Sequence, residues 1–453
     1  VTRELLFDVQ TTEDAAHQLA FFGGMDALAT LHSLPAAVHA AQAADLKRVL
    51  DAWLQPSQRT IGWYVPRKSE ATAGAAVSRP GPASDGAGGG AGNDLDRREA
   101  TPGWETRTAG RAAPGATVSQ LRNGVPLIMQ SSPLSPTVLL KVVVDGEVAL
   151  GFGDSRQGEP LDGVTSLDFQ LLPDELEGTA ARLREALEAY RVEAQGATDS
   201  GNDPGERLQA HFGDLLGLSR QLPAGPVRPR LIVVSGDFDP DLVRPLLQNT
   251  LGEMTPARGA APQGVNQTAR LELESRLGRP VAQERLGYLV RAPGPAEPEA
   301  AAWRMALYIL SHGYEGRLGK EAISRRGLVY YIDSAYRSNG AGGWVTLDIG
   351  VDPAKLPAMR DLLRSELERL QQQPPSQAEI DEARRHLLGR FVSAAQSNAE
   401  LADRLSREWL WYGELVDYAT LSAALGRVTR EDVLAILPGF TAGAIIAVRN
   451  PTP

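Results

Sequence analysis

The sequence predicts an α+β fold made of repeated two-layer domains, in which mixed or antiparallel sheets are packed with helices. Three observations predict this fold. Strand-like and helix-like segments alternate in mixed order along the chain. Asn-Gly turns at 123–124 and 339–340 join strand-like segments into hairpins. A helix–helix–strand pattern occurs at both ends of the chain. Hairpins in a mixed order argue against a doubly wound parallel sheet.

The composition is that of an ordinary globular protein with excess negative charge. The 453 residues suggest about three domains of roughly 150 residues each, and 42% of them are hydrophobic. The net charge of −10 argues against nucleic-acid binding, because phosphate recognition needs a basic face. No apolar run of about eighteen residues occurs, so no membrane span is expected. The chain has no cysteine, which excludes disulfides, thiolate metal ligands and cysteine nucleophiles.

A segment from Arg67 to Thr117 differs in composition from the rest of the chain. It is rich in Gly, Ala and Pro, includes the run Gly86–Gly92, and holds hardly any large apolar residue. Such a segment cannot bury enough surface to offset its chain entropy. The sequence therefore predicts a flexible linker at 67–117.

The piece before this linker, residues 1–66, predicts two helices and a strand. The helices are expected at Thr12–Phe22 and Ala36–Trp53, and the strand at Arg59–Val65. Sixty-six residues in this order make a poor independent domain. Because the chain also begins with Val1 and not Met, we expect it to be a fragment of a longer reading frame.

The end of the chain repeats this pattern. The apolar positions of the first helix and those of the second recur near the C-terminus at similar spacing, as does the closing strand, which suggests a duplicated unit. The alternative is that two Ala/Leu-rich helix pairs resemble each other by chance. The paired positions are Ala16 and Leu19 with Ala402 and Leu405, and Leu46, Val49 and Leu50 with Val433, Ile436 and Leu437.

The segment 118–265 opens with strands and continues with helices. Strands are expected at Val118–Leu121, Val125–Gln130, Thr137–Asp145 and Arg230–Ser235, and helices at Leu176–Glu193 and Glu206–Leu216. Asp239 and Pro240 predict the start of a further helix, because Asp is favoured at the N-cap and Pro in the first turn.

The segment 266–453 has the same mixed character. Arg270–Pro280 is interpreted as a linker, because it has few β-branched residues. Ser376 and Glu379 form the sequence pattern of a capping box. Strands are expected at Gln283–Val290, Gly327–Arg337 and Trp344–Val351, and helices at Pro298–Leu310, Pro353–Gln371 and Ile380–Ala395.

Several short motifs in this order resemble the zinc peptidases of the pitrilysin/insulinase family, also called inverzincins. The resemblance covers everything except the linker. It rests on Gly316-Arg317-Leu318, on Arg326-Gly327-Leu328-Val329-Tyr330 and on Gly350-Val351-Asp352-Pro353. Leu121–Val125 and Ser235–Pro240 resemble the opening and the close of the family's N-terminal-type domain.

The resemblance implies a clamshell of two halves, each holding two α+β domains. Residues 1–66 would be the C-terminal part of a preceding domain and 67–117 the linker. Residues 118–265 would be a degenerate N-terminal-type domain, and 266–453 a C-terminal-type, substrate-binding domain. Bacterial members are often periplasmic, so the resemblance favours that compartment, although the sequence itself does not fix it.

The family's zinc site is absent from the sequence. That site is His-x-x-Glu-His on a helix, where two histidines bind zinc and the glutamate activates water. No two of the six histidines are four residues apart, and the stretch after Asp145, where the motif is expected, contains none. We therefore expect no metal ligands and no catalytic residues in this chain, with zinc only in a partner half. The histidines are His17, His32, His39, His211, His312 and His386.

One substrate-binding residue is predicted by the resemblance. The family places an Arg seven residues before a Tyr, and the pair binds the substrate backbone or the oxyanion near zinc. Tyr330 matches the Tyr, but Ile323 stands at the Arg position. The alternative interpretation of Tyr330 is a half-buried strand residue that packs and donates one hydrogen bond.

These observations favour the non-catalytic half of a zinc metallopeptidase, which would complete the chamber and bind extended peptide for a zinc-bearing half. The expected partners are that half, in the same parent chain or as a separate subunit, and a peptide substrate; neither nucleic acid nor a membrane is expected. The alternative is a structural or interaction protein of the same fold that has lost peptide binding, which the replacement at Ile323 would permit. The chain alone is expected to be inactive.

Overall fold

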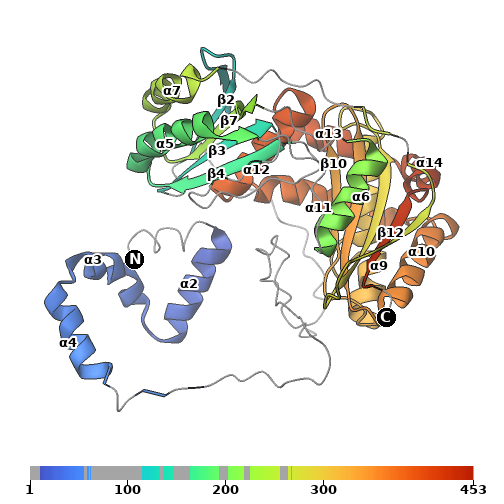
Figure 1. The fold of residues 1–453 in the computed structure, drawn as a ribbon, viewed down its shortest axis with the longest axis horizontal. Coiled ribbons are helices and arrows are strands. Elements are labelled where there is room, and N and C mark those ends of the chain that lie inside the picture. The colour runs from blue at the N-terminus through green and yellow to red at the C-terminus, as the bar shows by residue number, and fades with distance from the viewer. Residues whose placement is uncertain are drawn as a thin grey trace, which may run out of the picture.

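Two β-sheets and the helices that cover them form the body of the protein (Figure 1). The computed structural model describes residues 11–55, 59–60, 62, 115–132, 136–145, 148, 150, 164–192, 203–218, 225–255, 264–266 and 268–451. Most of the predicted strand at 59–65 and nearly all of the predicted linker at 67–117 fall outside these residues. Within the described part of the chain, no helix has the length and apolar character needed to cross a membrane.

The first sheet is built from the segment 117–236 and, among the described residues, has the strand order β1-β2-β7-β3-β4. The predicted hairpin is confirmed, because β1 pairs antiparallel with β2 across a turn in which Gly124 has a φ of 80°. β2 runs parallel to β7, whereas β3 is antiparallel to both β7 and β4. The strands are β1 Thr117–Gln120, β2 Pro126–Ser131, β3 Val138–Asp145, β4 Val164–Leu171 and β7 Pro229–Gly236.

The second sheet has the order β10-β11-β9-β12-β8 in the described residues. β8 is parallel to β12, and β9 is antiparallel to both β12 and β11. The run β8-β12-β9-β11 therefore repeats the strand directions of β2-β7-β3-β4. The strands are β8 Glu272–Arg276, β9 Glu284–Ala292, β10 Asp333–Ser338, β11 Gly343–Val351 and β12 Ala444–Arg449, and a separate short pair consists of β5 Arg191–Val192 and β6 Gly225–Pro226.

One face of each sheet is covered by helices of its own segment. On the first sheet these helices are α5, Leu176–Ala189, and α7, Pro240–Asn249. Asp239 caps α7 as predicted, since its carboxylate accepts a hydrogen bond from the Asp241 amide at 2.9 Å. On the second sheet they are α8 Ala300–Ser311, α10 Leu356–Gln372, α11 Gln377–Ser393, α13 Tyr418–Arg427 and α14 Arg430–Phe440.

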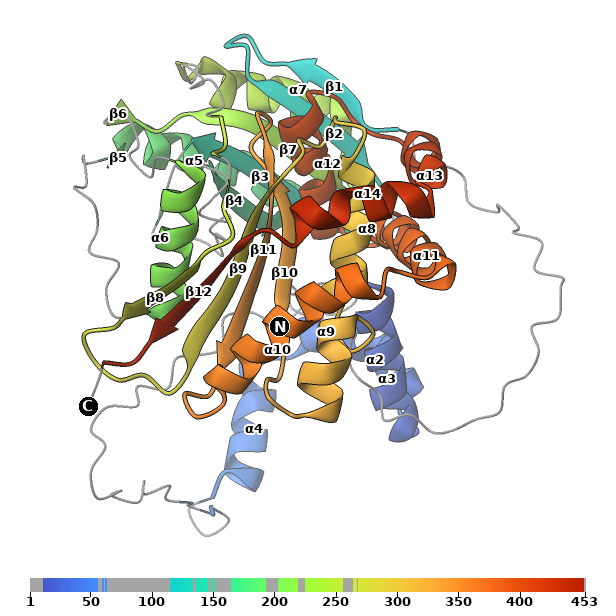
Figure 2. The ribbon, with the colours of Figure 1, turned by 90° about the vertical axis from the view of Figure 1, so that its right-hand side faces the viewer.

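The opposite face of each sheet is covered by a helix from the other segment (Figures 1 and 2). α12, Asn398–Tyr412, places Leu401, Ala402 and Leu405 against the first sheet. α6, Pro204–Leu216, lies on the second sheet. The segments 118–265 and 266–453 are thus interlocked by a reciprocal exchange of helices.

Three helices precede this body: α2 Thr12–Gly24, α3 Leu28–Ala40 and α4 Ala43–Trp53. The single helix predicted at Ala36–Trp53 was wrong, because Ala41 is extended and a new helix is capped after it. At this second start the Asp45 carboxylate accepts a hydrogen bond from the Gln42 amide at 3.1 Å. Their apolar side chains are largely exposed: Leu19 is 51% and Trp53 71% accessible.

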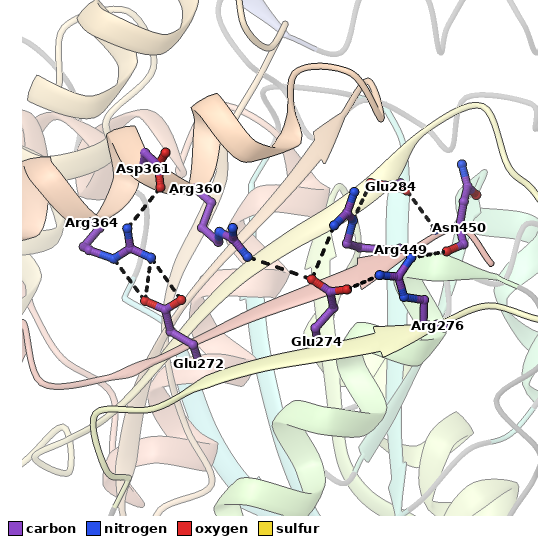
Figure 3. Close-up of polar contacts among 9 residues, drawn as sticks. All are labelled: Glu272, Glu274, Arg276, Glu284, Arg360, Asp361, Arg364, Arg449 and Asn450. Atoms are coloured by element: carbon purple, nitrogen blue, oxygen red, sulfur yellow. Dashed lines mark hydrogen bonds and ion pairs between the residues drawn. The ribbon is translucent and has the colours of Figure 1, made fainter. Parts of the chain in front are cut away.

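The prediction of a linker at Arg270–Pro280 was also wrong, because β8 lies within it. The strand lacks the alternation of apolar and polar residues that predicts a strand, and its glutamates form ion pairs with arginines (Figure 3). Glu272 binds Arg364 of α10 at 2.7 Å, and Glu274 binds Arg449 of β12 at 3.4 Å. The backbone pairing with β12 and these charge pairs together hold this edge strand.

Candidate functional site

Tyr330 lies on the surface, between a one-turn helix and strand β10. The strand predicted at Gly327–Arg337 begins only at Asp333, so Tyr330 stands at a bend before it. Its side chain is 82% exposed. The alternative of a half-buried packing residue was therefore wrong, and the phenol is accessible to a ligand. A backbone bend explains why alternation of apolar residues misplaced it in a strand.

Ile323, at the position of the family's arginine, lies in the π-helical turn η5, Lys320–Arg325. Its side chain is half-buried and packs against the core of the second sheet. Two arginines follow Ile323 closely in the sequence, but Arg325 and Arg326 both form ion pairs with the Glu321 carboxylate. Neither therefore takes the place of the missing arginine. Lys320, the other cation of η5, pairs with Glu315 at 3.4 Å, so both cations of this turn have an acidic partner.

A polar group of the second sheet adjoins this site through Tyr331. The Arg285 guanidinium donates to the Tyr331 hydroxyl at 3.3 Å and to the Asp348 carboxylate at 3.1 Å. Burial raises the pKa of Asp348, while the charge of Arg285 opposes this rise. Arg285 was not singled out from the sequence, because its neighbours come from distant strands.

The motif Gly316-Arg317-Leu318 proves to be structural. The Arg317 guanidinium forms a two-pronged ion pair with the Glu379 carboxylate at 2.8 and 3.0 Å, and Leu318 is fully buried. Burial alone would raise the pKa of Glu379, but hydrogen bonds from Arg317 and Ser376 lower it to about 2. Ser376 also caps α11, so the predicted capping box is confirmed. These charges line a surface cavity of about 250 Å³ and neutralise one another within it.

All six histidines lie in the described part of the chain. Among the described residues, which include all six, no group of three or more His, Asp or Glu side chains is placed to hold a metal ion. His312 and His386, however, are neighbours, with ring centroids 4.1 Å apart. Their separation of 74 positions in the sequence hid this proximity. Of the stretch after Asp145, where the zinc helix would be expected, residues 146–147, 149 and 151–163 fall outside the described residues.

Comparisons with known proteins agree with this fold. Residues 231–387 match the family model described as the peptidase M16 inactive domain. An uncharacterized zinc protease of Streptomyces coelicolor is 26% identical over 179 residues, which cover 39% of this chain and 38% of that protein. The match thus spans little more than a third of the relative's length.

Solved structures show the same α+β fold at low sequence identity. The peptidase M16 inactive domain of Pseudomonas fluorescens has a TM-score of 0.54 at 16% identity, over 75% of this chain and 98% of that chain. A protease of Helicobacter pylori has a TM-score of 0.58 at 13% identity, over 74% and 100%. The first half of the periplasmic protease PqqL of Escherichia coli has a TM-score of 0.52 at 14% identity, over 74% and 92%.

The segment 231–387 therefore carries a peptidase M16 inactive domain, and part of the chain is related to an uncharacterized zinc protease. This confirms both the resemblance drawn from the sequence motifs and the predicted α+β class. Zinc belongs to the catalytic members of such a family.

Proposed function

We propose that this chain is the non-catalytic half of a zinc metallopeptidase, which completes the chamber and binds peptide for a zinc-bearing half. One observation carries the proposal: the helices α2–α4 have the form of α12–α14 but leave exposed the apolar positions that α12–α14 bury. The zinc would be held by the partner, since this sequence has no His-x-x-Glu-His motif. A periplasmic location, like that of the PqqL protease, belongs to the same proposal.

The last helix of each set shows the correspondence most clearly. α4 and α14 are both 11 residues long. Each begins with the same cap, in which an aspartate accepts a hydrogen bond from the backbone three residues earlier; Asp45 does so at 3.1 Å and Asp432 at 2.8 Å. The helix starts of α2 and α12 match as well, with Thr11 and Ser397 at their N-caps.

The burial of the two sets differs sharply. Val433, Leu437 and Phe440 of α14 are at most 3% accessible, whereas Leu46, Leu50 and Trp53 at the same places of α4 are 62%, 51% and 71% accessible. Leu405 of α12 is 2% accessible against the first sheet, and Leu19 of α2 is 51%.

Burying each such side chain is worth about 1.5–3 kcal/mol. This contrast supports residues 1–66 as part of a preceding α+β domain. In the proposed complex, a sheet of the zinc-bearing half covers α2–α4, as the first sheet covers α12.

We expect Leu50→Asp to abolish pairing with the zinc-bearing half, because a charge would replace an apolar contact at the centre of the interface. Co-purification of the zinc-bearing half with the tagged variant measures this. Leu242→Asp is the matched control, since Leu242 is 71% exposed on α7, away from α2–α4. Equal recovery of the partner with Leu50→Asp and with the parent would contradict the proposed interface.

In the reconstituted complex, Tyr330→Phe should lower turnover of a fluorogenic peptide by at least about tenfold, since one donor to a developing oxyanion is lost. Tyr314→Phe, at a tyrosine that is 47% exposed, should leave turnover unchanged. Assembly, followed by size-exclusion chromatography, should be the same for both variants. Unchanged kinetics for Tyr330→Phe would show that the phenol takes no part in the reaction.

A structural role without peptide binding is the second candidate. The packing of Ile323 against the core favours it, because that position supplies no cation to a substrate. A complex that forms through α2–α4, yet binds peptide no more tightly than the zinc-bearing half alone, would support this second role.

A further inference from the structure

We propose that Tyr308, His312 and His386, here called the ring cluster, form an acid-sensitive clasp that holds α11 on α8 and thereby steadies α12 across the first sheet. The clasp is independent of the proposed peptidase role.

The ring cluster joins two helices that are distant in sequence. Tyr308 lies in the last turn of α8, His312 is its C-cap residue, and His386 projects from α11. The centroid of the Tyr308 ring is 4.5 Å from those of both imidazoles, and the two imidazoles are 4.1 Å apart. The three rings thus form a compact contact between α8 and α11.

Charged groups surround the ring cluster from both sides. On α11, Glu382 accepts a hydrogen bond from the Tyr308 hydroxyl at 3.4 Å. The charge of Arg385 opposes the rise in the pKa of Tyr308, and the charge of Arg390 lowers the pKa of His386. Glu315, just after α8, acts on His312. α13 meets α11 elsewhere, through Arg384, which donates to the carbonyls of residues 425 and 428.

The cluster favours neutral imidazoles. Burial lowers the pKa of His386 to about 4, and His312 and Arg390 add to this effect; burial also lowers the pKa of His312. The pKa of a histidine in the unfolded chain is about 6.5, so the unfolded chain takes up protons at a higher pH than the folded protein does. The stability that the neutral rings contribute is complete above about pH 6.5 and is lost toward about pH 4.

α11 is tied closely to the helix that joins the two sheets. Residues 394–397 alone separate it from α12. At the start of α12 the Asn398 side chain donates to the Thr137 carbonyl at 2.9 Å, and the Ser235 hydroxyl donates to the Asn398 carbonyl at 2.7 Å. Because the link is so short, release of α11 from α8 weakens the packing of α12 on the first sheet.

Hydrogen exchange of the full chain at pH 7.5 and pH 5.5, corrected for intrinsic rates, tests the clasp. Protection of amides in α11 and α12 should fall by about three- to tenfold at the lower pH, as the lowered pKa of a half-buried histidine requires. Protection in α5, which lies on the other face of the first sheet, should stay the same. His386→Phe, which keeps a ring but cannot titrate, should reduce the pH effect in α11 and α12.

A second variant and a control complete the experiment. His386→Gln is neutral at both pH values and should also reduce the effect, even if its protection is lower throughout. His39→Phe, at an exposed position of α3, should keep the full effect. Equal protection of α11 at the two pH values in the parent, or an undiminished pH effect in both His386 variants, would overturn the proposal.

Discussion

Lys141→Ala should lower the free energy of unfolding by about 3 kcal/mol, because it leaves a carboxylate without its ion-pair partner beside a buried apolar surface. Lys141 lies in the middle of β3 and is 2% accessible. It faces α12, where the neighbouring residues Leu139 and Val143 pack. Its ammonium group donates to the Ser166 hydroxyl at 2.7 Å and to both oxygens of Asp168 at 2.6 and 2.7 Å.

The network around Lys141 also joins the two segments of the body. The ammonium group forms a second ion pair with Asp403 of α12 at 2.8 Å. The side chain of Asp168 is 13% exposed, whereas that of Asp403 is 48% exposed and retains water when the lysine is removed. The expected loss therefore comes mainly from Asp168, and it is smaller than for a fully buried triad.

Urea unfolding of Lys141→Ala and of a control variant, each compared with the parent, measures this effect. Arg230→Ala is the control, since its pair with Asp145 is half-exposed on both sides and should contribute less than about 1 kcal/mol. Combining Lys141→Met with Asp168→Leu should restore much of the loss, because no charge is then stranded. A loss for Lys141→Ala no larger than that for Arg230→Ala would show that the network is not a stabilising link.

The parts of the fold that sequence reasoning predicted well depend on local signals. The turn at Asn123-Gly124, the cap at Asp239 and the capping box at Ser376 were all placed correctly. Each signal joins residues a few positions apart, so the chemistry of the pattern fixes the geometry.

The parts that were missed depend on contacts between distant segments. β8 was interpreted as a linker because its side chains are charged, and the arginines that hold it come from α10 and β12. The exchange of α6 and α12 between the sheets leaves no trace in the local pattern of either helix. At the candidate site, the motif located Tyr330, but its exposure depends on where the chain bends before β10.

Gly236→Ala should lower the free energy of unfolding by about 3–5 kcal/mol, as a sum of backbone strain and a steric clash. Gly236 belongs to the motif Ser235–Pro240 and ends β7 with a φ of 122°, which side chains other than hydrogen rarely tolerate. A methyl group here would overlap the Thr137 carbonyl oxygen and lie 2.7 Å from the Asn398 amide nitrogen. The same carbonyl accepts the hydrogen bond that seats α12.

Thermal and urea unfolding of Gly236→Ala, with Gly178→Ala as the matched control, measure this effect. Gly178 lies within α5, and a methyl group there meets no atom within 4 Å, so the control should gain up to about 1 kcal/mol from helix propensity. Because the clash separates Asn398 from Thr137, Gly236→Ala should also raise hydrogen exchange in α12 more than in α5. A variant as stable as the parent, with α12 still protected, would mean that the close approach of β7, β3 and α12 is not required.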